Sequence, residues 1–262
     1  MPPVGLDGAP NTRDVAQASA LVAPGRLYRA SALGRLTDAG VTELGRYGLR
    51  TVIDLRDVSE VAVAPPDRLP TPAPEVLDLP IYDPRHPVFT YVSAVLLGED
   101  HGSDYAALVE EGTPGAMLAI YRWFVSSEDA RERFAAGLRV LADADRLPAL
   151  VHCSAGKDRT GWLVALALEI VGADRASIER DYLATNHAAA EVNEAILRAM
   201  KERRAGLDPE DLRPVFEARA EYLAAAYEEV TRLYDSVDAY LRIGLGLSGA
   251  ELAAIRANLT GR

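Results

Sequence analysis

The sequence predicts an α/β fold, with a central, mostly parallel sheet of about four or five strands, flanking helices and a largely helical C-terminal half. Short apolar or β-branched segments alternate with helical patterns in the first half of the chain, whereas every patterned segment after Ala173 is helical. With 262 residues, 49% of them hydrophobic, the chain can bury the core of one large domain. We therefore expect residues 1–262 to form a single domain, with 173–262 packed on the sheet as helices.

Four segments are typical of short buried strands. The clearest is 51–55, Thr-Val-Ile-Asp-Leu, which is both β-branched and apolar. Residues 149–152 form a short apolar run after a proline, and 27–30 and 76–81 carry weaker strand patterns. Since these segments are separated by helical patterns, most of them should pair in parallel.

Helical spacing of apolar residues, with a cap-like Thr at the start of the first segment, predicts the helices. The expected helices are 37–47, 116–125, 128–142, 160–171, 177–183, 188–204, 214–243 and 248–258.

Three segments lack a regular pattern. Residues 1–26 are rich in Pro, Gly and Ala and should form an irregular lead-in, and the proline-dense stretch 65–74 should be a loop. Residues 84–115 mix apolar residues with Pro, Gly and charges; such a long, weakly patterned segment is often a lid, and we expect a lid insertion here. Its apolar residues would cover the functional site or pack against the helical tail; they are Phe89, Tyr91, Val95, Leu96 and Leu97.

Composition excludes several classes of function. A formal net charge of -11 argues against nucleic acid as a partner, although local cations and backbone dipoles could still bind a small anion. The single cysteine rules out an intrachain disulfide. The N-terminus lacks a basic region followed by an apolar run, and no apolar run is long enough for an integral membrane segment. We expect a cytoplasmic protein, although export without a cleaved signal would leave no mark in the sequence.

The segment 151–163, Val-His-Cys-Ser-Ala-Gly-Lys-Asp-Arg-Thr-Gly-Trp-Leu, carries the chemistry. Cys153 is followed by five residues and Arg159, between a strand and the start of a helix, where unpaired N–H groups and the helix dipole favour an anion and a thiolate. Arg159 offers a planar fork of donors that matches phosphate oxygens, and Gly156 permits a tight turn. The residues expected to bind the phosphate are Ser154, Ala155, Gly156, Lys157, Asp158, Arg159 and Thr160.

This segment resembles the phosphate-binding signature of the protein tyrosine phosphatase superfamily. The form Ala155-Gly156-Lys157-Asp158-Arg159-Thr160-Gly161 is similar to an atypical prokaryotic group of tyrosine or dual-specificity phosphatases, some of which accept phosphoinositides. The likeness extends to 11–14 (Asn-Thr-Arg-Asp), 27–31, 53–56, 181–186 and 245–248, and departs from the group at Ala16-Gln17, where two glycines are common. It implies a tyrosine phosphatase-like fold and a phosphorylated protein or phosphoinositide substrate, with no cofactor and no metal.

The general acid that protonates the leaving oxygen is open between two aspartates. Asp158 lies beside Arg159, and an aspartate at this place takes the role in the similar myotubularin-like lipid phosphatases. Asp83 follows a predicted strand and could reach the same sheet edge. Asp57 also follows a strand, but Arg56 beside it suggests a structural pair.

Other polar residues near the loop have two interpretations each. Lys157 could neutralise a multiply charged headgroup or face solvent, and Thr160 could hydrogen-bond the cysteine sulfur. His152 is expected to hold the loop by hydrogen bonds, whereas the other histidines lack metal-ligand spacing. Three arginines would add positive potential at the mouth of the site or form structural pairs; they are Arg13, Arg29 and Arg56.

The sequence therefore predicts a cysteine-dependent phosphomonoesterase in which Cys153 forms a phosphocysteine that water then hydrolyses. One alternative is a pseudophosphatase that binds phosphate without turnover. A rhodanese-type sulfurtransferase is disfavoured by the length of the loop and by Asp158 and Thr160. An arsenate reductase would need further cysteines, which are absent.

Overall fold

A computed structural model describes residues 5–97, 106–203 and 208–262. Within these residues, five strands form one sheet in the order β1-β2-β5-β3-β4. They are β1 (Arg13–Asp14), β2 (Leu27–Ala30), β3 (Thr51–Asp54), β4 (Glu75–Asp78) and β5 (Ala149–His152). Only β1 is antiparallel to its neighbour, so the prediction of a mostly parallel α/β sheet is confirmed.

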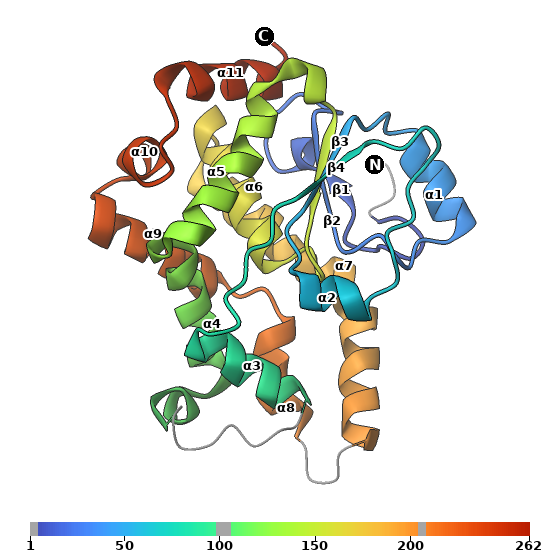
Figure 1. The fold of residues 1–262 in the computed structure, drawn as a ribbon, viewed down its shortest axis with the longest axis vertical. Helices are drawn as coiled ribbons and strands as arrows, with labels where there is room; N and C mark the ends of the chain where they lie inside the picture. Colours follow the sequence, from blue (N-terminus) through green and yellow to red (C-terminus); the bar gives the residue numbers. More distant parts are fainter. Residues whose placement is uncertain (1–4, 98–105, 204–207) are drawn as a thin grey trace.

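Helices cover both faces of this sheet (Figure 1). The helices are α1 (Asp38–Gly45), α2 (Val58–Val63), α3 (Pro87–Leu97), α4 (Ala106–Ser126), α5 (Glu128–Ala142), α6 (Asp158–Val171), α7 (Arg175–Arg203), α8 (Pro209–Phe216), α9 (Ala220–Tyr234), α10 (Val237–Ala239) and α11 (Gly249–Thr260). Three short turns of other helix types are η1 (Val15–Gln17), η3 (Ala144–Arg146) and the π-helix η4 (Tyr240–Gly244).

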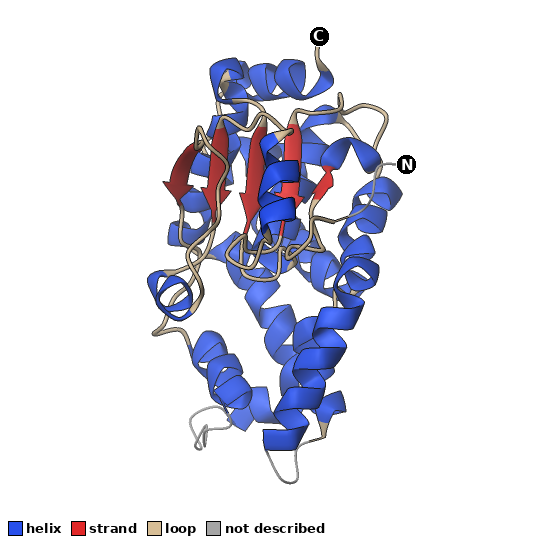
Figure 2. Cartoon of the chain, turned by 90° about the vertical axis from the view of Figure 1, so that its right-hand side faces the viewer, coloured by secondary structure: helices blue, strands red, loops and turns tan. Residues whose placement is uncertain are grey.

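Strand β5 lies at the centre of the sheet, paired in parallel with β2 and with β3. The register places His152 opposite both Ala30 and Asp54, so the segments that follow the three strands leave the sheet at the same edge. Figure 2 shows this edge facing α3, α4, α7 and α8, which extend away from the sheet. The loop that follows β5 therefore lies where several elements converge.

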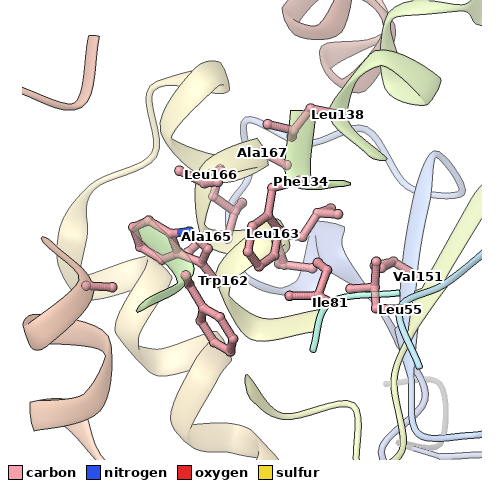
Figure 3. Close-up of a cluster of buried hydrophobic side chains, with 14 of the residues drawn as sticks. Leu55, Ile81, Phe134, Leu138, Val151, Trp162, Leu163, Ala165, Leu166 and Ala167 are labelled. Carbon is pink, nitrogen blue, oxygen red and sulfur yellow. The ribbon is translucent and has the colours of Figure 1, made fainter. Parts of the chain in front are cut away.

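The main core lies between the sheet and α6 (Figure 3). Trp162, Leu163 and Leu166 of α6 are fully buried and belong to the same cluster as Phe134 of α5 and Val151 of β5. Helix α11 packs against α5 and α6, on the side of the molecule opposite α8. Because α6 is anchored along its length, its first turn, at the functional loop, is held firmly against the sheet.

Most of the helices predicted at 37–47, 116–125, 128–142, 160–171 and 248–258 are confirmed, with ends that shift by a few residues or, for α4, further. Strand β4 is shorter than the predicted 76–81, and the lead-in 1–26 contains β1 and η1. The two helices expected at 177–183 and 188–204 are the single helix α7.

The predicted continuous helix over 214–243 is wrong. The structure has the end of α8, then α9, α10 and most of η4 there, and the junction of α8 and α9, at Glu217 and Arg219, is extended. Hydrogen bonds from α7 hold the junction open, because Asn186 donates to Ala218 O and accepts from Ala218 N, both at 2.7 Å. Asn193 donates to Phe216 O at 3.0 Å. Tertiary hydrogen bonds have thus overridden a helical pattern.

The predicted lid at 84–115 lies partly outside the described residues, at 98–105. Its described parts form α3 and the beginning of α4. Phe89 packs against Tyr82 and Trp123, with ring centroids 4.8 Å apart in both pairs, and is buried in the main core. The closure of this segment over the site stays a prediction. None of the helices searched, in the described part of the chain, has the length and apolarity to cross a membrane.

We predict that Asn186→Ala destabilises the protein, because it leaves both backbone groups of Ala218 without their partner. The free energy of unfolding, measured by urea denaturation, should fall by about 1–3 kcal/mol. Asn193→Ala removes one hydrogen bond from the same junction and serves as the matched control, with a smaller loss. Equal losses in the two variants would contradict this account.

Candidate active site

The loop between β5 and α6 places Cys153 at the end of a buried strand and Asp158 at the first turn of a helix. Cys153 is 2% exposed, and no side chain caps α6 at its N-terminus. The backbone N–H groups of 154–158 form no hydrogen bond with any other described group. These unpaired donors, together with the helix dipole, favour an anion in the loop.

Gly156 is required by the shape of the loop. Its φ is +66°, and a Cβ on it would lie 2.1 Å from Ala30 O, so no other residue fits without moving β2. The expectation that a glycine allows the tight turn is confirmed.

Arg159 is held by a residue that the sequence analysis missed. Its two terminal nitrogens donate to the Glu60 carboxylate at 2.5 and 2.6 Å, and one of them also donates to Leu55 O at 3.1 Å. Ser154 Oγ donates to the same carboxylate at 2.6 Å. Glu60 belongs to α2, where it completes a capping box with Asp57. The spacing Asp57-x-x-Glu60 was the available signal, but it marks a helix start and says nothing of Arg159.

Charge pairing sets the protonation states of this clamp. Burial by itself would raise the pKa of Glu60, but the hydrogen bonds and charge of Arg159 bring it down to about 2. Burial opposes the charge of Arg159 as well, yet the bond to Glu60 and the nearby Cys153 raise its pKa above the usual range. The pair is therefore ionised at neutral pH.

Asp158 is oriented by two buried tyrosines. Tyr121 Oη donates to Asp158 Oδ1 at 2.9 Å and lies 2.6 Å from Tyr182 Oη. Burial and the Asp158 charge raise the pKa of both tyrosines well above the usual value, so both stay protonated. The Asp158 side chain keeps 23% of its surface exposed, so it is partly accessible to solvent.

Lys157 does not face solvent. It is 1% exposed, and Nζ donates to Val215 O at 2.5 Å and to Glu217 O at 2.9 Å, at the junction of α8 and α9. Nζ also lies 3.4 Å from Asp158 Oδ1. Burial lowers the pKa of Lys157, and the neighbouring Asp158 acts in the opposite direction. The ammonium group thus holds the helical tail against the loop.

Asp83 is not brought into contact with the loop in the described structure. Its Oδ1 accepts from Arg85 N at 2.9 Å, in the turn that precedes α3. Asp57 serves as the N-cap of α2, which agrees with a structural role. Thr160 is fully buried, but its hydroxyl has no hydrogen-bond partner among the described groups, so the expected bond to the cysteine sulfur is not formed here.

His152 lies behind the loop in a charged cluster. Its Nδ1 is 3.8 Å from Asp54 and 3.4 Å from Cys153 O, and its Nε2 is 3.4 Å from Asp67. Asp54, Asp67 and His152 are close enough together to hold a metal ion. Arg56, however, donates to both carboxylates, at 2.7 and 2.6 Å, and already supplies the cation. The donor set is therefore a structural ion pair network. Arg56 does form structural pairs, but with Asp54 and Asp67 rather than with Asp57, the partner that the sequence suggested.

The remaining two arginines also form buried pairs. Arg13 Nε donates to Asp181 Oδ1 at 2.9 Å, and Arg29 donates to the other oxygen of Asp181. Arg29 additionally donates to Gly156 O at 2.7 Å. The positive charge of this network lies behind the loop rather than at its mouth.

Comparison with known proteins shows which family this chain belongs with. The model of the tyrosine phosphatase family matches residues 4–261. The chain is 36% identical to the triple specificity protein phosphatase PtpB of Mycobacterium tuberculosis, over 98% of each chain. It is 31% identical to a protein of Cupriavidus necator assigned as a tyrosine-protein phosphatase, over 88% of this chain and 78% of that protein. A tyrosine-protein phosphatase of Nostoc commune is 30% identical over 69% of this chain and 56% of its own length.

We predict that His152 makes the fold sensitive to mild acid. Burial lowers the pKa of His152 below its ordinary value. The charges of Asp54 and Asp67 tend to raise this pKa, and the charge of Arg56 lowers it further. A lowered pKa means that the unfolded chain binds the proton more readily. The stabilisation of the fold by neutral His152 is therefore complete above about pH 6.5, and it is lost as the pH falls through the pKa that His152 has in the folded protein.

The free energy of unfolding should accordingly fall between pH 7 and pH 5, measured by denaturant titration at each pH. His152→Gln should have a smaller slope in this range, whereas the wild-type slope should persist in His187→Gln, whose side chain is exposed. An unchanged slope in His152→Gln would contradict the prediction.

Proposed function

The chain belongs to the tyrosine phosphatase family, and we propose that it hydrolyses phosphomonoesters of proteins, phosphotyrosine first, through a phosphocysteine on Cys153. The observation that carries this proposal is the loop itself, in which a buried cysteine and Arg159 flank a run of unpaired N–H groups. The protein is accordingly a protein-tyrosine phosphatase, a phosphoric monoester hydrolase. Residues 1–262 are proposed to act as a single phosphatase domain; the match to 4–261 supports this.

In the first step, the Cys153 thiolate attacks phosphorus in line with the ester bond. A sulfur–phosphorus bond forms, the bond from phosphorus to the leaving oxygen breaks, and that oxygen takes a proton from a carboxylic acid. The loop amides and Arg159 bind the three remaining phosphoryl oxygens, on which charge is spread in the transition state. Glu60 keeps the guanidinium plane in place, so that Arg159 need not reorganise during the reaction.

We assign the general acid to Asp158 rather than Asp83. Asp158 is part of the loop, is oriented by Tyr121 and is partly accessible to solvent. Asp83 is engaged by the backbone of its own turn. An acid must lie within hydrogen-bond reach of the leaving oxygen, and of these two aspartates Asp158 is the one that belongs to the loop expected to bind the phosphate.

In the second step, water attacks phosphorus and the sulfur–phosphorus bond breaks, which releases inorganic phosphate and restores the thiolate. The Asp158 carboxylate, having given its proton to the leaving group, accepts one from the water. The buried Thr160 hydroxyl has no other partner among the described groups and is available to donate to the departing sulfur.

Phosphoinositides are a second substrate class, suggested by Lys157 in the loop. A cation next to Arg159 could bind a second phosphate of a headgroup. In this structure, the ammonium group of Lys157 donates to Val215 O and Glu217 O. Lys157 would first have to exchange these carbonyls for the headgroup. We therefore propose phosphotyrosine, with other phosphorylated residues, as the principal substrate, and inositol lipids as an additional one.

We predict that Asp158→Asn lowers turnover on a substrate with a poor leaving group more than on one with a good leaving group. A phosphoserine peptide should lose about 10²–10⁴-fold in kcat, whereas an activated aryl phosphate should lose much less. Asp83→Asn is the matched control and should stay near wild type on both substrates.

The panel is completed by a phosphoinositide and by Cys153→Ser. If none of these substrates releases phosphate in a reaction that depends on Cys153, the pseudophosphatase alternative is favoured. Thiosulfate-dependent thiocyanate formation would favour the sulfurtransferase. If Asp83→Asn rather than Asp158→Asn loses activity on the peptide, the assignment of the acid is wrong.

We further predict that Glu60→Gln lowers kcat/KM on an aryl phosphate by about 10–100-fold, because a neutral amide cannot hold Arg159 by two charged hydrogen bonds. Glutamine keeps the capping box intact, but loss of the ion pair with Arg159 should also lower the melting temperature, so kcat/KM is compared well below it. Glu43→Gln removes an exposed ion pair with Arg46 and is the control for loss of charge alone. Increased activity in Glu60→Gln would instead indicate that Glu60 competes with the substrate for Arg159.

A further inference from the structure

The side chain of Asn11 lies against the outer side of the phosphate loop. Asn11 is 1% exposed, and its Nδ2 donates to Ala155 O and to Gly156 O, both at 3.0 Å. The two partners are successive carbonyls, 144 and 145 residues away in sequence. A single carboxamide thus uses both of its hydrogens to hold two neighbouring peptide groups of the loop.

The orientation of the carboxamide is determined by its other partner. Arg13 donates from one nitrogen to Asn11 Oδ1 at 2.5 Å and to Asn11 O at 3.2 Å. Since arginine has only donors, it must face the carboxamide oxygen, and the NH2 group must face the loop. Arg13 is itself fixed by Asp181, through Nε and through a bond of 2.7 Å to Asp181 O.

Holding these carbonyls also determines where the amides point. In a planar trans peptide, the C=O and N–H groups lie on opposite sides. A bound Ala155 carbonyl therefore turns the N–H of Gly156 away from Asn11, and a bound Gly156 carbonyl does the same for the N–H of Lys157.

Two neighbouring contacts act in the same sense. Ala32 N donates to Ser154 O at 3.1 Å, and Arg29 donates to Gly156 O at 2.7 Å. Three successive carbonyls are thus bound from outside, whereas the N–H groups of 154–158 have no partner among the residues described. This division is what an anion site built from backbone amides requires.

We infer that Asn11 is a positioning residue of the phosphatase reaction: it orients the loop peptides so that their N–H groups meet the thiolate and the phosphate. The inference rests on the proposed function for its catalytic meaning, and on the loop contacts alone for its effect on anion binding. Asn11 does not touch the reacting atoms and acts only through the peptides that it holds.

The test is Asn11→Asp, which preserves shape but replaces the donor NH2 with an oxygen that repels the two carbonyls. Asn11→Ala removes the donors without adding charge. Thr12→Val is the matched control in the same buried segment, because Thr12 Oγ1 donates to Ala9 O at 2.8 Å and no hydrogen bond links its side chain to the loop among the described residues.

Three measurements separate positioning from stability. The first is the pH midpoint of Cys153 alkylation by iodoacetamide, the second the concentration of inorganic phosphate that protects Cys153, and the third kcat/KM on an aryl phosphate. In Asn11→Asp, the midpoint should rise by about one pH unit or more and the protecting concentration by about tenfold or more, because oriented donors to an anion are lost. kcat/KM should fall by about 100-fold. Asn11→Ala should shift in the same direction by less.

Thr12→Val should lower the melting temperature without moving the alkylation midpoint or the phosphate protection. If Asn11→Asp and Asn11→Ala lower only the melting temperature, or if neither variant folds, the inference is wrong and Asn11 has a structural role only. The alkylation and protection measurements need no turnover, so they remain decisive if the wild type releases no phosphate, an outcome that would count against the proposed function instead.

Discussion

The geometry of the loop depends on the buried carboxylate of Asp181. Its two oxygens bind two guanidinium groups, those of Arg13 and Arg29, and all three side chains are nearly inaccessible to water. Burial would raise the pKa of Asp181, but the two arginines hold it below the usual value. Burial and the charge of Arg29 bring the pKa of Arg13 down to about 10, against the attraction of Asp181. Removing three charges from water costs desolvation free energy, and loss of the one anion would leave two buried cations without their carboxylate partner.

The loop is held from three directions by parts of the chain that are far apart in sequence. The N-terminal segment and β2 bind its carbonyls through Asn11 and Arg29. Helix α2 fixes the guanidinium of Arg159 through Glu60. The buried Tyr121 of α4 fixes the carboxylate of Asp158. Each contact acts on a different group of the loop, so the site is organised before any substrate enters, and little reorganisation is left for the transition state.

The sequence predicts what is local and misses what is tertiary. The strand-loop-helix around Cys153 was predictable because the residues that indicate its strand, its turn and its helix start are neighbours in the sequence. Glu60 was missed because its pairing with Arg159 spans 99 residues and its local pattern indicates only a helix start. The break near Ala218 and the burial of Lys157 were missed for one shared reason. Lys157 donates to the carbonyls of the junction between α8 and α9. The same hydrogen bonds therefore bury the lysine, which was expected to face solvent or substrate, and involve the break in a helix that was predicted to be continuous.

The charges of the loop also explain how an acidic protein can attract a phosphate. Both cations of the loop have a carboxylate partner: Lys157 lies beside Asp158, and Arg159 pairs with Glu60. The loop therefore holds little excess side-chain charge. The remaining attraction comes from the unpaired amides and from the single excess charge of Arg13, Arg29 and Asp181 behind them.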